Sequence, residues 1–367
     1  MKIGILKESQ DARVAMIPAV ATKMINLEHE LFLEKGAGAQ AFYADEEYDA
    51  VGVKVVDRAT LFSDMEALIS ITPLDAEDRS KLKPGTILIS LFNPRGNAEL
   101  VEELRQSDLR PFSLDAIPRI TIAQAMDVLS SMASLAGYKA VLMAANELPG
   151  YFPMLMTAAG TIPPAKVLIL GAGVAGLQAI ATARRLGATV EAFDVRSAVK
   201  EEVQSLGAKF VEVEGATEDK GAGGYAVEQS EEYQRRQKEL IHERAARADV
   251  IITTANIPGR QAPLLIEQRT VEAMRPGSII VDLAAATGGN CAVTENDKTI
   301  VFDGVKVIGN SNLPAEMPRD ASLLYSNNML NFVKYVFENG PDNLDYSKEI
   351  VSKTFLGKLP ETVASEQ

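Results

Sequence analysis

A glycine-rich loop between a strand pattern and a helical pattern is the segment best suited to chemistry. The apolar run Lys166–Leu170 leads directly into Gly171-Ala-Gly-Val-Ala-Gly176, and a helical pattern continues to Leu186. The first glycine of such a loop allows a tight turn, the second lets the backbone approach a pyrophosphate, and the third lets helix and strand pack closely. The helix N-terminus adds free N–H groups and partial positive charge. The pattern predicts a dinucleotide site, although a turn that serves packing alone would use the same glycines; the expected contacts are Gly171, Gly173, Val174, Ala175 and Gly176.

An acidic residue follows this loop at the distance that such a site requires. The next strand pattern, Thr189–Phe193, ends at Asp194, which lies 23 residues after Gly171. A carboxylate at this position accepts hydrogen bonds from the adenosine ribose and repels a 2′-phosphate, which favours NAD(H) over NADP(H). Arg196 lies two residues further on and is a second candidate contact, since an arginine there can also accommodate a 2′-phosphate.

The composition excludes several other kinds of site. The chain of 367 residues has one cysteine, Cys291, and two histidines, His29 and His242, so a disulfide framework, a cysteine-rich zinc site and a histidine-based catalytic triad are not expected. No metal site is predicted. The net charge of -13 and the lack of a Lys/Arg cluster argue against binding to nucleic acid.

Alternating strand and helix patterns predict an α/β protein with two doubly wound parallel sheets. Length alone suggests two domains, and a cleft between such units is a common ligand site. We expect a discontinuous first domain, residues 1–130 and 316–367, and a nucleotide-binding domain, residues 131–315, linked by helices over Ile120–Leu148 and Asp320–Phe337. The predicted strands are Lys2–Leu6, Glu30–Leu33, Val53–Val56, Ala67–Ile71, Thr86–Leu91, Arg110–Ser113, Lys166–Leu170, Thr189–Phe193, Lys209–Val213, Asp249–Thr253, Ser278–Asp282 and Lys306–Ile308.

Two uncharged stretches are the candidates for insertion into a membrane. Gly150–Ala165 contains three prolines and Val167–Ala183 contains three glycines, so neither suits a membrane span. We expect both to be buried elements of a soluble protein. Charged residues begin at Lys2, Lys7 and Glu8, so a signal peptide is not expected either, and the predicted compartment is the cytoplasm.

Several motifs together resemble the proton-translocating NAD(P) transhydrogenases. They include Pro118-Arg-Ile-Thr-Ile-Ala-Gln-Ala-Met-Asp-Val-Leu-Ser-Ser131, Leu135-Ala-Gly-Tyr138, Thr157-Ala-Ala-Gly160 and Gly171-Ala-Gly-Val-Ala-Gly-Leu-Gln178. Thr253-Thr-Ala-Asn-Ile-Pro-Gly259 and Val281-Asp-Leu-Ala-Ala285, with Gly288-Gly-Asn-Cys291, add support. The chain is similar to the NAD(H)-binding domain I, which is the soluble alpha subunit in multi-subunit members, and the likeness extends over nearly its whole length.

The resemblance implies an oxidoreductase that works with partners. It implies a Re/Si-specific, proton-translocating transhydrogenase, in which this subunit presents NADH for direct hydride transfer to NADP+ on a beta subunit. A separate membrane-spanning component would couple that transfer to proton movement. The family also implies a homodimer that lies at the cytoplasmic face of the inner membrane and reaches the membrane only through its partners.

The resemblance also assigns roles to individual residues. Arg119, Gln124 and Asp127 match the loop that borders the nicotinamide, and Ser130 matches a serine near its carboxamide. Without the resemblance, the same residues suit a helix N-terminus, with Asp127 as the cap and Arg119 as a surface charge. Tyr225 corresponds to the tyrosine of a mobile loop that closes over bound nucleotide, and the sequence from Glu212 to Glu228 is long, polar and glycine-rich. Two further contacts are expected at the end of a strand, Thr254 and Ala255.

Two other functions remain open at this stage. The chain is also similar to alanine dehydrogenases, with which it shares Lys7-Glu8 and Arg13-Val14-Ala15. That enzyme needs a lysine, a histidine and an aspartate near its substrate, but the matching segments Ala67–Thr72, Ser90–Phe92 and Ala284–Ala286 contain none of them. A nonenzymatic NAD(H)-sensing module would use the same nucleotide loops, and only hydride transfer with an NADP(H)-binding partner separates it from a transhydrogenase subunit.

Overall fold

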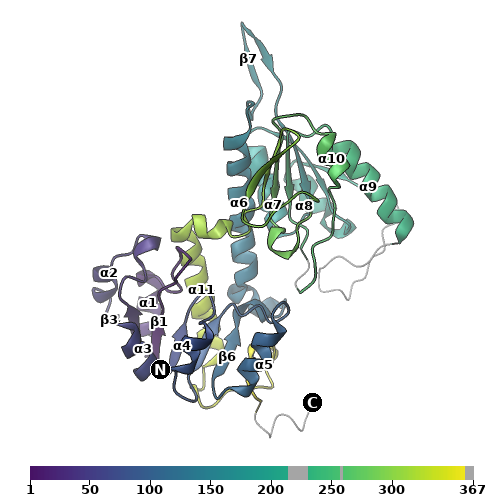
Figure 1. Ribbon diagram of the computed structural model, residues 1–367. Helices are drawn as coiled ribbons and strands as arrows, with labels where there is room; N and C mark the ends of the chain where they lie inside the picture. Colours follow the sequence, from purple (N-terminus) through teal and green to yellow (C-terminus); the bar gives the residue numbers. More distant parts are fainter. Residues whose placement is uncertain (214–229, 257–258, 360–367) are drawn as a thin grey trace. The chain divides into compact units, whose positions relative to one another are not determined.

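The computed structural model describes residues 1–213, 230–256 and 259–359, which fall into two compact units (Figure 1). Unit 1 comprises residues 1–132 and 315–367, and unit 2 comprises residues 133–314. Each unit contains its own parallel sheet with helices between the strands. The predicted α/β class with two doubly wound sheets is therefore confirmed.

Unit 1 has a six-stranded, fully parallel sheet with the strand order β3-β2-β1-β4-β5-β6. Polar side chains begin three of its helices, because Asp57, Asp75 and Asn97 each accept a backbone N–H of the first turn. The strands are β1 (Lys2–Ile5), β2 (Glu30–Glu34), β3 (Lys54–Val56), β4 (Ala67–Ile69), β5 (Ile87–Ser90) and β6 (Arg110–Ser113). The helices are α1 (Pro18–Ile25), α2 (Asp45–Asp49), α3 (Arg58–Asp64), α4 (Ala76–Ser80), α5 (Ala98–Gln106), α11 (Pro318–Val336) and α12 (Glu349–Thr354).

Unit 2 has the strand order β11-β10-β9-β12-β13-β15-β14, in which the last strand is antiparallel and was not predicted. This is the dinucleotide-binding order with one added edge strand. The strands are β9 (Lys166–Leu170), β10 (Thr189–Phe193), β11 (Lys209–Val211), β12 (Val250–Thr253), β13 (Ile279–Asp282), β14 (Thr299–Phe302) and β15 (Val305–Ile308). The helices are α7 (Val174–Arg185), α8 (Lys200–Ser205), α9 (Glu231–Ala245) and α10 (Gln268–Glu272); α6 (Val128–Glu147) begins in unit 1 and continues into unit 2.

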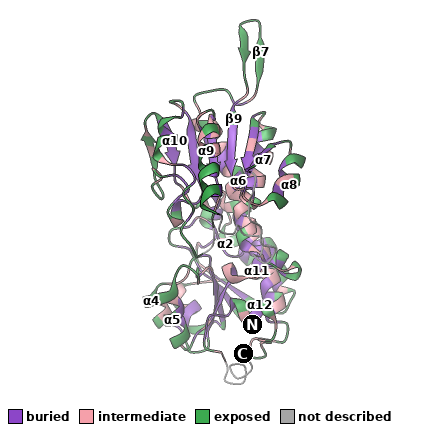
Figure 2. Ribbon diagram, turned by 90° about the vertical axis from the view of Figure 1, so that its right-hand side faces the viewer, coloured by how far each residue is buried: buried purple, intermediate pink, exposed green. Residues whose placement is uncertain are grey.

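Both faces of the unit 2 sheet are covered, and Figure 2 shows its strands as buried. Side chains alternate between the two faces along a strand. Val167 and Ile169 of β9 belong to a cluster with residues of α6 and α7, whereas Leu168 and Leu170 belong to a cluster with residues of α9 and α10. The continuous apolar strands of this unit are explained by burial on both sides.

The predicted helix over Ile120–Leu148 is interrupted at Asp127. A 3₁₀ helix covers Thr121–Met126, and α6 begins at Val128. Asp127 has a ψ of 89°, outside the helical range, and its carboxylate accepts hydrogen bonds from Ser130 N–H at 2.9 Å and Ser130 Oγ at 2.5 Å. Asp127 therefore caps α6, which separates the two segments.

The prediction that Gly150–Ala165 is a buried element is wrong. This stretch contains a two-stranded antiparallel hairpin, β7 (Leu155–Thr157) and β8 (Gly160–Ile162), in which every strand residue is exposed. The hairpin projects from unit 2 (Figure 2). Among the described residues its strands pair only with each other, so its apolar side chains have no third described strand to pack against.

One helix among the described residues is long and apolar enough to cross a membrane by length and composition alone. It is α6, and a third of its most apolar window is buried within the structure. Neither of the two uncharged stretches considered from the sequence is a single long helix, because the first contains the hairpin and the second combines β9 with most of α7.

Candidate functional site

The glycine loop of unit 2 requires a glycine at two positions. Gly171 has a φ of +100°, and a Cβ atom there would lie 2.5 Å from Thr254 Oγ1. A Cβ atom on Gly176 would lie 1.9 Å from the carbonyl oxygen of Gly171. These two glycines are therefore required by the tight turn and by the close packing of α7 on β9.

Gly173 differs from the other two glycines of the loop. A Cβ atom at this position would meet nothing within 4 Å, and its φ of -79° suits any residue. The packing of the chain therefore does not require a glycine here. A glycine at this position is explained when a ligand approaches the backbone closely, as a pyrophosphate does in dinucleotide sites.

The N-terminus of α7 is available for an anion. Gly173 is its N-cap residue, no side chain caps the helix, and its first turn has no acidic residue. Val174 is 44% exposed at the start of the helix, and Ala175 is half-buried. The N–H groups of a first turn have no partner within the helix and carry the positive end of its dipole, so they suit a phosphate group.

Asp194 lies at the end of the neighbouring strand β10 and joins this loop. Its Oδ2 accepts the N–H of Ala172 at 2.7 Å, and it forms an ion pair with Arg196 Nη2, also at 2.7 Å. Arg196 also donates to Oδ1 through its backbone N–H and its Nε, both at 2.9 Å. The hydrogen bond to Asp194 raises the pKa of the Arg196 guanidinium. The carboxylate thus connects the glycine loop to the basic side chain two residues further along.

The end of β12 lies against the glycine loop. Thr254 Oγ1 donates to the carbonyl oxygen of Gly171 at 3.0 Å, and the N–H of Ala255 donates to Asn290 Oδ1 at 3.1 Å. Both residues are half-buried. The structure therefore brings together Gly171–Gly176, Asp194, Thr254 and Ala255 at the carboxyl ends of adjacent parallel strands, where such sheets bind ligands.

Two buried polar residues near this edge were missed from the sequence. Asp282 and Asn290 are both fully buried, and Asn290 contacts the backbone of Ala255 directly. The available signal was weak: an acid at the end of a strand, followed by Gly288-Gly289-Asn290.

The remaining predicted site residues lie in unit 1 or outside the described residues. Arg119 and Gln124 are exposed, on the segment that precedes α6. Asp127 and Ser130 form the cap of that helix, so the structural alternative for Asp127 is realised, and both side chains remain half-buried. Tyr225 lies outside the residues that the structure describes, as does most of the segment Glu212–Glu228.

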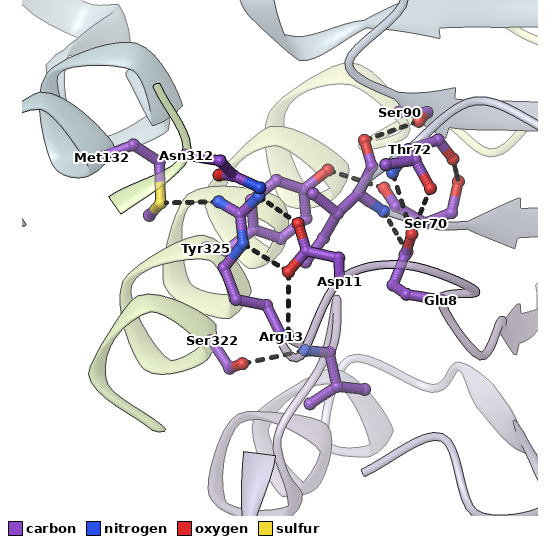
Figure 3. A network of polar contacts seen from close by, with 12 residues as sticks. Glu8, Asp11, Arg13, Ser70, Thr72, Ser90, Met132, Asn312, Ser322 and Tyr325 are labelled. Atoms are coloured by element: carbon purple, nitrogen blue, oxygen red, sulfur yellow. Dashed lines mark hydrogen bonds and ion pairs between the residues drawn. The ribbon is translucent and has the colours of Figure 1, made fainter. Parts of the chain in front are cut away.

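Unit 1 contains a second polar cluster, at the carboxyl ends of β1, β4 and β5 (Figure 3). Glu8 accepts the N–H groups of Ile71 at 2.6 Å and Thr72 at 3.1 Å, as well as the Thr72 hydroxyl. Burial raises the pKa of the Glu8 carboxyl, against the lowering effect of these hydrogen bonds. The hydroxyl of Tyr325 in α11 donates to the carbonyl oxygen of Ser70 at 2.7 Å.

Two charged groups of this cluster, Arg13 and Asp11, bind each other. Arg13 forms an ion pair with Asp11 at 2.5 Å, and its Nη1 lies 3.2 Å from the sulfur of Met132. Arg13, Asp11 and Glu8 are each 6% exposed. The hydrogen bonds hold α11 and the loops after β1 and β4 together, so the cluster has a sufficient structural explanation without a ligand.

The described residues offer no cluster of three or more histidine, cysteine or acidic side chains that could hold a metal ion. Cys291 is buried, and this burial raises the pKa of its thiol to about 11. The thiol is therefore neutral at physiological pH and unsuited to nucleophilic chemistry.

Comparison with known proteins matches both halves of the chain. The family models described as "Alanine dehydrogenase/PNT, N-terminal domain" and "Alanine dehydrogenase/PNT, C-terminal domain" match residues 4–136 and 140–359. The first part of NAD(P) transhydrogenase subunit alpha of Rhodospirillum rubrum is 44% identical over 343 residues, which cover 91% of this chain and 89% of that protein.

Solved structures show the same two relationships. A crystal structure of a transhydrogenase from Sinorhizobium meliloti has a TM-score of 0.89 and 40% identity, and the match covers 98% of this chain and 99% of that one. An L-alanine dehydrogenase has a TM-score of 0.82 and 25% identity, with 100% of this chain and 98% of that one covered. The similarity to transhydrogenase alpha subunits is thus greater than that to alanine dehydrogenase.

Proposed function

This chain belongs to the alanine dehydrogenase/PNT family, and on that basis we propose that it is the NAD(H)-binding alpha subunit of a proton-translocating NAD(P) transhydrogenase. The observation that carries the proposal is the glycine loop of unit 2 with Asp194 beside it. Gly173 leaves open the space that a pyrophosphate needs, and α7 offers an uncapped N-terminus. Bound NAD(H) supplies the hydride chemistry, which the side chains of this chain do not provide.

Each half of the nucleotide has its own proposed contacts. Gly171, Gly173 and the first turn of α7 bind the pyrophosphate, while Asp194 accepts hydrogen bonds from the adenosine ribose. Arg119, Gln124 and Ser130 contact the nicotinamide end, and Asp127 holds Ser130 through the capping hydrogen bonds. Gln124 and Ser130 can offer uncharged donors and acceptors to a carboxamide. Tyr225, Thr254, Ala255 and Arg196 complete the proposed set.

The proposed reaction needs no general acid or base from this subunit. Direct hydride transfer depends on two rings held in close contact with water excluded, so positioning supplies most of the rate acceleration. The acceptor, NADP+, is proposed to lie on a beta subunit. A membrane-spanning component couples the transfer to proton movement, which gives this chain a peripheral position at the cytoplasmic face of the inner membrane.

We also propose that the chain forms a homodimer. The β7–β8 hairpin and the residues just before it expose a group of large apolar side chains, and a second copy of unit 2 would give them a surface to pack against. Their exposed fractions run from 37% to 72%, in the order Leu155, Ile162, Tyr151, Met154 and Met156.

One assay separates the proposed function from its rivals. The purified chain is mixed with a transhydrogenase NADP(H)-binding subunit, and hydride exchange between NADH and an oxidised NAD analogue is followed in the presence of NADP(H). The proposed function predicts exchange that requires both proteins. Alanine oxidation by the chain alone, without exchange, would establish the dehydrogenase instead. Tight NADH binding with neither activity would favour a sensing module.

A further inference from the structure

Asp282 is a buried carboxylate that accepts hydrogen bonds from the end of β12 and from the residues that follow β13. Its exposed fraction is 0%. Oδ1 accepts the Thr253 hydroxyl at 2.8 Å and the Ala284 N–H at 3.0 Å. Oδ2 accepts the N–H groups of Asn290 and Cys291 at 2.8 and 3.1 Å, together with the Thr294 hydroxyl at 2.8 Å. Five donors on one carboxylate satisfy a buried charge that would otherwise be costly.

Asn290 connects Asp282 to the residues that follow β12. It is also 0% exposed. Its Oδ1 accepts the N–H of Ala255 at 3.1 Å, while its Nδ2 donates to the carbonyl oxygen of Ala255 at 2.8 Å and to that of Pro263 at 2.8 Å. The side-chain amide thus satisfies both backbone groups of Ala255, as a neighbouring strand would.

Ala255 and the glycine loop are in turn adjacent. Thr254 Oγ1 donates to Gly171, and the N–H of Thr254 donates to Leu170 at 2.8 Å. The path from Asp282 through Asn290 to Ala255 and Thr254 therefore ends at the turn that receives the pyrophosphate. Gly289 belongs to the same arrangement, because a Cβ atom on it would lie 2.9 Å from Asp282 Oδ2.

We propose that Asp282 and Asn290 are positioning residues for NAD(H): they fix the backbone of Thr254 and Ala255 against the glycine loop in the conformation that binds the nucleotide. Neither side chain contacts the nucleotide in this proposal. The inference extends the proposed function, since it assumes that the nucleotide lies at this edge of the sheet. A buried amide that pairs with backbone groups of a binding loop fixes the loop at little entropic cost on binding, which is how a rigid second layer supports a site.

The test is the substitution Asn290→Ala in the full-length chain, with NADH affinity measured by the fluorescence of the bound nucleotide. The variant removes all three side-chain hydrogen bonds to Ala255 and Pro263. We expect the dissociation constant for NADH to rise at least tenfold. In the exchange assay with the NADP(H)-binding subunit, we expect KM for NADH to rise while kcat stays within about twofold, because ground state and transition state lose the same binding.

Ser278→Ala is the matched control. Ser278 is also buried, and its hydroxyl donates to the carbonyl oxygen of Ala248 at 3.3 Å. Ser278 directly precedes β13, so it lies at the opposite end of that strand from Asp282. If Asn290 has a purely structural role, Asn290→Ala and Ser278→Ala should both lower the melting temperature, and the folded protein should keep its NADH affinity in both variants. The proposal requires the affinity to change in Asn290→Ala only.

The results distinguish a failure of the proposed function from a failure of the positioning role of Asn290. If the unaltered chain binds no NADH, the proposed function fails. If it binds NADH and folded Asn290→Ala binds equally well, the positioning role is overturned while the proposed function stands. Should Asn290→Ala not fold, Asn290→Ser replaces it, because serine retains a small polar group at the site. We expect the NADH affinity of Asn290→Ser to fall at least threefold, and an unchanged affinity would overturn the positioning role.

Discussion

Replacing Asp194 is the most informative single perturbation of the proposed nucleotide site. In the structure this carboxylate accepts hydrogen bonds from the Ala172 N–H and from three donors of Arg196, so its ribose-binding capacity is shared with an ion pair. Two ribose hydroxyls would each contribute about 1.5–3 kcal/mol as hydrogen bonds to a charged group. Displacing part of the Arg196 fork costs less, about 0–1 kcal/mol, since that side chain is 27% exposed.

Two such bonds give about 3–6 kcal/mol, so after this cost the net loss in Asp194→Ala is at least about 2 kcal/mol, or at least roughly 30-fold in the NADH dissociation constant. The opposite change is expected for NADPH. Without its carboxylate partner, Arg196 can form a charge-assisted hydrogen bond with a 2′-phosphate, which is worth about 1.5 kcal/mol and roughly tenfold in affinity. The preference for NADH over NADPH should thus narrow by at least about 300-fold, the product of the two effects.

Titration calorimetry with both nucleotides measures this preference. Asp194→Asn separates charge from shape and should give the same direction with a smaller loss of NADH affinity. The control is Asp249→Asn, because Asp249 also accepts a backbone N–H, that of Lys166 at 2.8 Å, and pairs with Arg275, but precedes β12 instead of following a strand. Equal affinities of the unaltered chain and folded Asp194→Ala for NADH would refute the assignment of Asp194 to the ribose.

Three further predictions concern other parts of the chain. Gly173→Ala should keep the melting temperature within about 2 °C yet abolish detectable NADH binding. Gly176→Ala should lower both the melting temperature and the NADH affinity, because only the Cβ atom at position 176 clashes within the protein itself. Normal NADH binding by Gly173→Ala would contradict the proposed pyrophosphate position. Burial, with a smaller contribution from the N-terminal charge, lowers the pKa of His29 below 6.5, so the unfolded state takes up more protons as the pH falls below 6.5 and stability is lost in that range. Urea unfolding at pH 7.5, 6.5 and 5.5 should therefore show a shallower acid loss for His29→Gln than for the unaltered chain, and identical slopes would exclude His29 as the cause. Met156→Glu should convert the dimer to a monomer in sedimentation experiments, while Val301→Glu, at a similarly exposed position of the edge strand β14 (67% against 72%), should not; a monomeric unaltered chain would remove the basis of the homodimer proposal.

The parallel strands were the easiest elements to predict from the sequence. Arg110–Ser113, Lys166–Leu170 and Thr189–Phe193 have the predicted ends. Lys166–Leu170 shows the reason most clearly, because it is a short apolar run between Pro164 and Gly171 that is buried on both faces. Exposed elements were harder. β14 alternates between exposed and half-buried residues, and the hairpin at Leu155–Ile162 has no buried face at all, so neither has the apolar signal of a core strand.

The glycine loop and its acidic partner, which we propose bind the nucleotide, were recognisable from local sequence, because the requirements of a tight turn and a close approach are met by glycines at fixed spacing. What only the tertiary structure decided is which distant groups hold that loop in place. Asp282 and Asn290 lie 111 and 119 residues after Gly171 in sequence, and an acid at the end of a strand followed by two glycines and an asparagine is only a weak local signal. Their importance comes from burial and from hydrogen bonds to Thr253 and Ala255, which exist only once β12 and β13 pair side by side. Local chemistry thus specified the ligand-facing surface, and long-range packing specified its support.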